Sequence, residues 1–288
     1  MVKFRRSGGL SGNVEDRRAA GGRAGIPIGG AMGGGAIGII TLLIAVFLGG
    51  GLGGGGGTGS GLPDIFSQLQ SPGGTVDPAD DELVQLMSDA LDDIQAFWST
   101  DAGLGARYED ATLVLFSGGV STAGCGDAPS SVGPFYCPAD HKAYVDLDFF
   151  RELRQRFGAP GDFAQVYVLA HELGHHVQNL LGTSDDVRAA QQQDPDRANE
   201  HSVRLELQAD CYAGVWGNSA KDRGLLEPGD LAEGIAAAAA VGDDRLGNPS
   251  EESWTHGSSE SRQRWFMVGF ESGDHEQCNT FEVPADQL

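Results

Sequence analysis

The sequence predicts an α+β fold, mainly helical with a small sheet, and three observations lead to this class. Six segments between residues 77 and 270 are predicted to be helices, and the first of them repeats apolar residues at the three- and four-residue spacing of an amphipathic helix. Two short runs, Thr112–Phe116 and Ala143–Leu147, are rich in β-branched and aromatic residues and are typical of strands. No internal repeat divides the chain, so we expect one domain over residues 77–288.

The first 76 residues differ from this domain in composition. Residues 1–30 carry a net charge of +4, show no apolar period and are predicted to form a disordered basic tail. Of the 45 glycines, 22 lie in the first 62 residues, which argues against a packed core there. Residues 54–76 are therefore predicted to be a flexible glycine-rich linker.

An apolar run, Ala36–Leu48, lies between the tail and the linker. A spanning helix needs about 20 residues, and the flanking glycines and alanine extend the run to residues 31–53, because membrane helices tolerate glycine. A cleaved signal peptide is the alternative, although the basic segment before the run is long and no A-x-A site follows it. We expect a single transmembrane helix at residues 31–53 that anchors the protein in the cell membrane. The positive-inside rule then places residues 1–30 in the cytoplasm and the C-terminal domain outside.

The domain is expected to begin with a helix over Asp77–Trp98, because Asp77-Pro78 matches an N-cap followed by proline at the first helical position. Residues 117–138 are rich in glycine, serine and proline and are predicted to form a loop. Asp162 and Gln165 have the spacing of a capping box before the next apolar helix, and Gly182 is expected to end that helix. Residues 183–197 are predicted to be mainly a connection. The remaining helices are expected at Phe149–Phe157, Asn199–Trp216, Asp230–Val241 and Ser258–Phe270.

Charge and cysteines limit the classes of function and compartment. After residue 30 the net charge is -26, and a domain this acidic lacks the basic surface that binding to nucleic acid requires. The cysteines form no C-x-x-C pair, which argues against a zinc ribbon or finger. Disulfides Cys125–Cys137 and Cys211–Cys278 are expected if the domain is exported, and four buried free thiols are the alternative.

The apolar helix at residues 162–181 contains the sequence His171-Glu172-Leu173-Gly174-His175, an H-E-x-x-H motif. Residues four apart lie on one face of a helix, so His171 and His175 can bind one metal ion while Glu172 acts on a water molecule. A catalytic zinc takes three protein ligands and keeps one position for water. Glu206 on the following helix is the predicted third ligand. Asp210, four residues later, is expected to accept the second ring N–H of a ligand histidine.

These residues resemble the gluzincin pattern of zinc peptidases, H-E-x-x-H followed by E-x-x-x-D. The chain more closely resembles the bacterial neutral zinc metallopeptidase family (YpfJ-like). Besides the motif helix, the matching stretches are residues 13–18 (NVEDRR), 133–138 (GPFYCP), 205–211 (LELQADC), 242–246 (GDDRL) and 254–258 (WTHGS). The resemblance runs from the N-terminal tail to the last helix and implies a zincin-like (mini-gluzincin) domain and a membrane-anchored, zinc-dependent peptidase.

The implied mechanism is hydrolysis of a peptide bond by a zinc-activated water, with one catalytic Zn²⁺ and Glu172 as general base. The group that stabilises the oxyanion is expected to be His256, in a loop flanked by glycine and serine, with Tyr212 as a weaker candidate. The strand Tyr144–Leu147 precedes the motif helix and is expected to pair as an edge strand with an extended peptide. The partners are therefore a peptide or protein substrate and the membrane.

Two other functions are compatible with parts of this pattern. A non-catalytic, zinc-stabilised, extracytoplasmic domain that binds a partner could use the same three ligands, although a structural site has no need of Glu172 and usually fills the fourth position. A di-iron carboxylate bundle needs paired Glu-x-x-His motifs, and only Glu172–His175 has that spacing. His176, five residues from His171, is expected to point away from the metal.

Overall fold

The computed structural model describes residues 2–4, 8–18, 78–101, 103–129, 132–157, 161–246 and 250–288. The predicted transmembrane helix at 31–53, the linker at 54–76 and the Asp77 cap lie outside these residues. Within the described ranges, no helix is long and apolar enough to cross a membrane. The fold combines helices with a small sheet, as the predicted α+β class requires.

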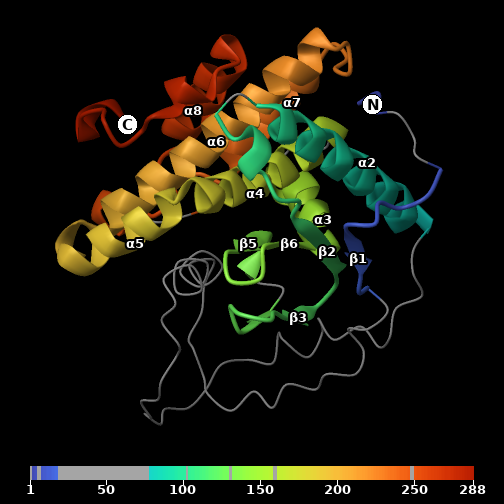
Figure 1. The fold of residues 1–288 in the computed structure, drawn as a ribbon, viewed down its shortest axis with the longest axis horizontal. Coiled ribbons are helices and arrows are strands. Elements are labelled where there is room, and N and C mark those ends of the chain that lie inside the picture. The colour runs from blue at the N-terminus through green and yellow to red at the C-terminus, as the bar shows by residue number, and fades with distance from the viewer. Residues whose placement is uncertain are drawn as a thin grey trace.

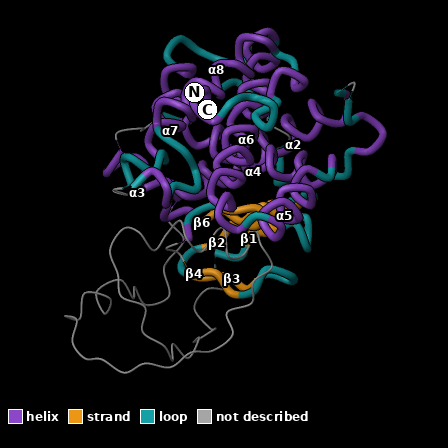
Figure 2. Tube along the Cα trace, turned by 90° about the vertical axis from the view of Figure 1, so that its left-hand side faces the viewer, coloured by secondary structure: helices purple, strands orange, loops and turns teal. Residues whose placement is uncertain are grey.

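Helices make up most of the domain, and the sheet lies against one side of them (Figures 1 and 2). The motif helix α4 runs through the centre and packs against α2, α6 and α7, while α8 lies along α6. Close approach of α6 and α8 depends on Gly269, because a Cβ there would meet the Cys211 carbonyl oxygen at 1.9 Å. The helices are α2 (Pro78–Thr100), α3 (Leu147–Phe157), α4 (Asp162–Leu181), α5 (Thr183–Gln193), α6 (Ala198–Asp222), α7 (Asp230–Ala240) and α8 (Ser259–Ser272). Short 3₁₀ turns are η2 (Gly105–Arg107), η4 (Pro195–Arg197), η5 (Glu251–Ser253), η6 (His275–Cys278) and η7 (Ala285–Gln287).

The main sheet has the order β1-β2-β6-β5, and β3 and β4 form a separate antiparallel pair. Strands β1, β2 and β6 are parallel, and β5 is antiparallel to β6. Alternate side chains point to opposite faces: Leu113 and Val145 enter the main core with the helices, whereas Val114 and Tyr144 enter a second, smaller core. The strands are β1 (Val14–Asp16), β2 (Thr112–Phe116), β3 (Gly119–Ser121), β4 (Asp127–Pro129), β5 (Phe135–Cys137) and β6 (Lys142–Asp146).

The prediction of a disordered basic tail is wrong for residues 2–4 and 8–18. Strand β1 pairs with β2 in the register Val14–Leu113, and Val2 is buried with its backbone N–H 2.5 Å from Asp162 Oδ2. A strand and its hydrogen-bonded neighbour must lie on the same side of a bilayer. A tail in the cytoplasm with the domain outside, as a single crossing would require, is therefore incompatible with this sheet.

Several local predictions also need correction. Residues 117–138 are not a plain loop but contain β3, β4 and β5, and residues 183–197 form α5 and η4 rather than a connection. The N-cap of α4 is Gly161, without a side-chain cap, and Asp162 instead binds the backbone of Val2, so the capping box is absent. The C-terminal prediction is confirmed: Gly182 ends α4 in the left-handed conformation, with φ 87°.

Candidate metal centre

The two motif histidines lie on one face of α4, as their spacing predicts. His171 and His175 are buried, and their Nε2 atoms are 3.1 Å apart. The third predicted ligand comes from α6. Glu206 Oε2 lies 3.2 Å from His171 Nε2, and Glu206 Oε1 lies 3.3 Å from His175 Nε2.

A close crossing of α4 and α6 brings these groups together. A Cβ on Gly174, between the two histidines, would lie 2.9 Å from the Ala209 carbonyl oxygen of α6. Glycine is therefore the residue that lets the second helix approach the motif. A side chain at this position would push Glu206 and Asp210 away from the histidines.

The donor set fits a tetrahedral zinc ion. The three ligand atoms lie within 4.8 Å of one another, and ligands about 2.05 Å from a tetrahedral zinc are separated by about 3.3 Å. The separations between the donor atoms, 3.1–3.3 Å, match that spacing. Asp210 and Gln178 bind the two Nδ1 atoms, so both Nε2 lone pairs face the carboxylate. Such a group of converging donor atoms can hold a cation at its centre.

His171 is held by a buried charged network. Its Nδ1–H donates to Asp210 Oδ1 at 2.9 Å, and the same carboxylate accepts a hydrogen bond from Tyr167. Arg262 of α8 binds both oxygens of Asp210, through Nε at 2.7 Å and Nη2 at 3.0 Å. Burial disfavours a charge on His171, but Asp210 and Glu206 nevertheless raise its pKa to about 9. The network thus favours a positive charge at this position, whether a proton or a metal ion.

His175 is held by a neutral chain of amides. Its Nδ1–H donates to Gln178 Oε1 at 2.8 Å, and Gln178 Nε2 donates to Gln208 Oε1 at 3.0 Å and to the Leu205 carbonyl oxygen at 2.7 Å. Gln208 Nε2 in turn donates to the Cys278 carbonyl oxygen at 3.1 Å. Because Gln178 accepts the Nδ1–H, His175 is held in the tautomer whose Nε2 carries a lone pair toward Glu206.

Glu172 lies beside the ligand set and is only 6% exposed. Burial raises the pKa of its carboxyl, against the lowering influence of His171 and His175. Burial alone would also raise the pKa of Glu206, but nearby His175 and His256 hold it well below its usual range. The pKa of Glu206 is therefore lowered, which suits a metal ligand, and the pKa of Glu172 is raised, which suits a general base.

His256 acts on the same group, because it is one of the influences that lower the pKa of Glu206. The loop that carries it is fixed by Asp243, whose Oδ2 accepts backbone N–H groups from Thr255, His256 and Gly257 at 2.8, 2.7 and 3.0 Å.

Other candidates lie elsewhere. Tyr212, the weaker oxyanion candidate, is buried on a different face of α6 from Glu206, where it packs edge-on against Trp98. His176 points away from the ligands, as predicted, with Nε2 donating to the Glu109 carbonyl oxygen at 2.6 Å and Nδ1 accepting from Tyr136 at 2.8 Å. Strand β6 lies between β2 and β5, so the prediction that it is an edge strand is wrong.

Both predicted disulfides are present, Cys125–Cys137 and Cys211–Cys278, and no cysteine is free among the described residues. The first joins the loop after β3 to β5. The second joins Cys211 of α6, the residue after Asp210, to Cys278 of η6. The alternative of free thiols is excluded for this structure.

Besides Asp210, which was predicted, two residues that support the candidate ligands, Gln178 and Arg262, were not identified from the sequence. Gln178 could have been found, because it lies three residues after His175 and so on the same helix face. Arg262 gave no such signal, since it lies more than 50 residues from Asp210 and only the packing of α8 on α6 joins them.

A mainly helical domain with two histidines and a glutamate at zinc spacing defines the class of zinc-metallopeptidase-like proteins. The chain belongs to the family described as "putative neutral zinc metallopeptidase", whose model matches residues 3–281. It is 45% identical over 285 residues to the uncharacterized protein YpfJ of Escherichia coli K12, covering 94% of this chain and 96% of that protein. It is 50% identical over 192 residues to the uncharacterized protein Rv2575 of Mycobacterium tuberculosis H37Rv, covering 61% and 64%. No solved structure matches.

Proposed function

We propose that this protein is a gluzincin-type endopeptidase that holds one zinc ion with His171, His175 and Glu206. The observation that carries the proposal is the convergence of three donor atoms at tetrahedral spacing, with both imidazole tautomers fixed by Asp210 and Gln178. Membership of a zinc metallopeptidase family supports the same activity.

Bound zinc would lower the pKa of a coordinated water toward about 7 and polarise the scissile carbonyl. Glu172 follows His171 directly and has a raised pKa, so it is suited to take a proton from the attacking water and give it to the leaving amine. His256, on the loop clamped by Asp243, donates to the oxyanion that develops.

Substrate is proposed to bind along β5 instead of β6. Strand β5 forms the edge of the main sheet and packs against α4. An extended peptide added to this edge would be recognised mainly through its backbone, which imposes little sequence specificity. Polypeptides in an unfolded or extended state are therefore the expected substrate class.

The domain is proposed to act outside the cytoplasm, because disulfides persist in oxidising compartments. Membrane attachment through residues 31–53 stays a prediction. Since β1 precedes that segment and β2 follows it, such an attachment has to leave both flanks on one side of the bilayer.

The test is the Glu172→Gln substitution, with Glu260→Gln on the exposed start of α8 as its control. Glu172→Gln should retain zinc and lose cleavage of a peptide library, whereas Glu260→Gln should keep both. N-terminal proteomics of cells carrying each form would then identify the cleaved proteins. Unchanged turnover by Glu172→Gln would refute the role of the base. A wild-type protein that binds zinc but cleaves nothing would favour the non-catalytic alternative.

A further inference from the structure

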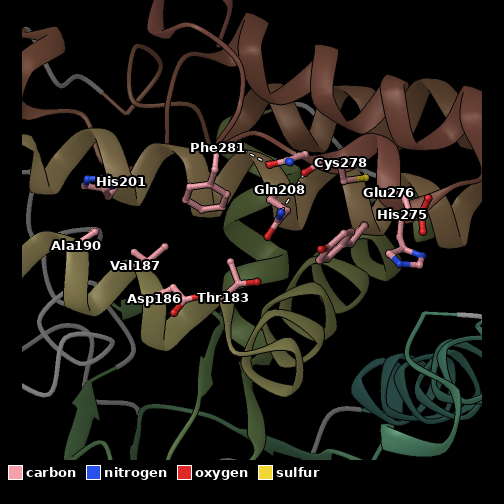
Figure 3. Close-up of a pocket in the computed structure, with 12 residues that line it drawn as sticks. Thr183, Asp186, Val187, Ala190, His201, Gln208, His275, Glu276, Cys278 and Phe281 are labelled. Carbon is pink, nitrogen blue, oxygen red and sulfur yellow. Dashed lines mark hydrogen bonds between the residues drawn. The ribbon is translucent and has the colours of Figure 1, made fainter.

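A cavity of about 610 Å³ lies between α5, α6 and the segment around η6. Figure 3 shows Asp186 and Val187 of α5 across the cavity from His201 and Gln208 of α6, with Phe281 projecting from the C-terminal segment. None of these residues belongs to the ligand set or to the proposed substrate edge at β5.

The cavity lies on a different face of α6 from Glu206. His201, Gln208 and Tyr212 are spaced by seven and four residues and share one helix face. Glu206 is two residues from Gln208, a rotation of about 200° around the helix axis. A ligand in this cavity would therefore lie on a different face of α6 from a peptide at the metal.

The lining of the cavity favours an organic cation. It includes the carboxylates of Asp186 and Glu276, both exposed, and the lining side chains include no lysine or arginine. Phe281, in the segment after η6, contributes an aromatic ring to the lining, and Val187 of α5 adds apolar surface. Carboxylates together with an aromatic ring suit an amine on an apolar body, and they repel anions such as phosphates.

The cavity is also joined to the metal centre by hydrogen bonds. Gln208 lines the cavity, binds the Cys278 carbonyl oxygen and accepts from Gln178, which holds the Nδ1–H of His175. A ligand that moves the Gln208 side chain changes the partner of Gln178. The orientation of His175 then responds to what occupies the cavity.

We propose that this cavity is a binding site for a small organic cation and that its occupancy is coupled to zinc binding through Gln208 and Gln178. Cation binding is independent of the proposed peptidase activity. Only the coupling depends on His175 being a zinc ligand.

Binding is tested by calorimetry on the full chain without zinc, with phenethylamine as the probe and 2-phenylethanol as its uncharged match. Phenethylamine should bind at least about tenfold more tightly, and the double substitution Asp186→Asn/Glu276→Gln should remove that preference. Asp185→Asn, an exposed neighbour on α5 that does not line the cavity, should leave it unchanged. Equal binding of amine and alcohol, no saturable binding of the amine, or an equal effect of Asp185→Asn would overturn the site.

Coupling is tested by measuring zinc affinity by chelator competition with and without saturating phenethylamine. The normal chain should show a shift of about fivefold or more, and Gln208→Met, which breaks the amide chain, should show none. An identical shift in both proteins, or no shift in either, would overturn the coupling while leaving the peptidase proposal to its own test with Glu172→Gln.

Discussion

Replacing Asp210 by alanine tests whether its carboxylate acts on the metal ligand or only on the fold. Asp210 is fully buried and accepts hydrogen bonds from His171, Tyr167 and Arg262. Its loss leaves the buried guanidinium of Arg262 with the more distant Glu206, at 3.9 Å, as its charged partner, which costs about 3 kcal/mol or more of folding free energy. His171 also loses the acceptor that fixes its tautomer, and zinc affinity should fall about 10–100-fold.

A double substitution separates these two effects. Asp210→Leu combined with Arg262→Met removes both charges and keeps a similar volume, so stability should return to within about 1 kcal/mol of the normal chain. His171 Nδ1 still has no acceptor, so zinc affinity should remain low. Stability is measured by urea denaturation in the presence of a chelator, and affinity by competition with a zinc indicator. If zinc affinity recovers together with stability, Asp210 acts through the fold, and its proposed role in orienting His171 is refuted.

Three further changes have expected outcomes. Gln178→Leu should lower zinc affinity about 10–100-fold, because His175 loses the acceptor for its Nδ1–H; unchanged affinity in the indicator assay would contradict this. Replacing Cys211 and Cys278 by serine opens a 67-residue loop and should lower the free energy of unfolding by about 4 kcal/mol. The same replacement at Cys125 and Cys137 opens a 12-residue loop and should lower it by about 3 kcal/mol. Equal or reversed losses in urea denaturation would contradict the loop-entropy argument. Burial lowers the pKa of His176 from the ordinary 6.5 to about 4. The neutral imidazole therefore contributes its full stabilisation above pH 6.5, and up to about 3 kcal/mol of the free energy of unfolding is lost as the pH falls to 4. His176→Gln in zinc-free protein should remove that part of the pH dependence, and identical curves for the two proteins would refute it.

The candidate ligand set was predictable because the relative positions of its residues depend on the period of two helices and on one crossing between them. His171 and His175 are fixed relative to each other by the period of α4 alone, and Glu206 with Asp210 by the period of α6. The sequence could not show how closely the two helices cross. That distance depends on Gly174, whose missing side chain leaves room for the Ala209 backbone.

The sheet was harder to predict for a physical reason. Strand β2 was predicted with its correct bounds, because a run of β-branched and aromatic residues is buried on both faces. Strands β3, β4 and β5 are three residues long and lie among glycine, serine and proline, where turn residues hide any alternation. They gain stability from the second core and from the Cys125–Cys137 disulfide rather than from local propensity. Residues 183–193 have few apolar positions and become helical by packing against α4 and α6.

The tail shows most clearly where composition misleads. Its arginines suggested a cytoplasmic flank of a membrane helix, but that rule assumes basic side chains that have no partners in the folded domain. Arg18 instead binds Asp16 at 2.7 Å and Asp81 of α2 at 3.0 Å, and Glu15 binds Lys142 of β6 at 2.5 Å. The domain after residue 30 has a net charge of -26, which favours docking of a segment whose charge is +4. Once Val14 has paired with Leu113 of β2, Arg17 and Arg18 belong to the folded domain, and these two charges no longer report on the orientation of the chain in a membrane.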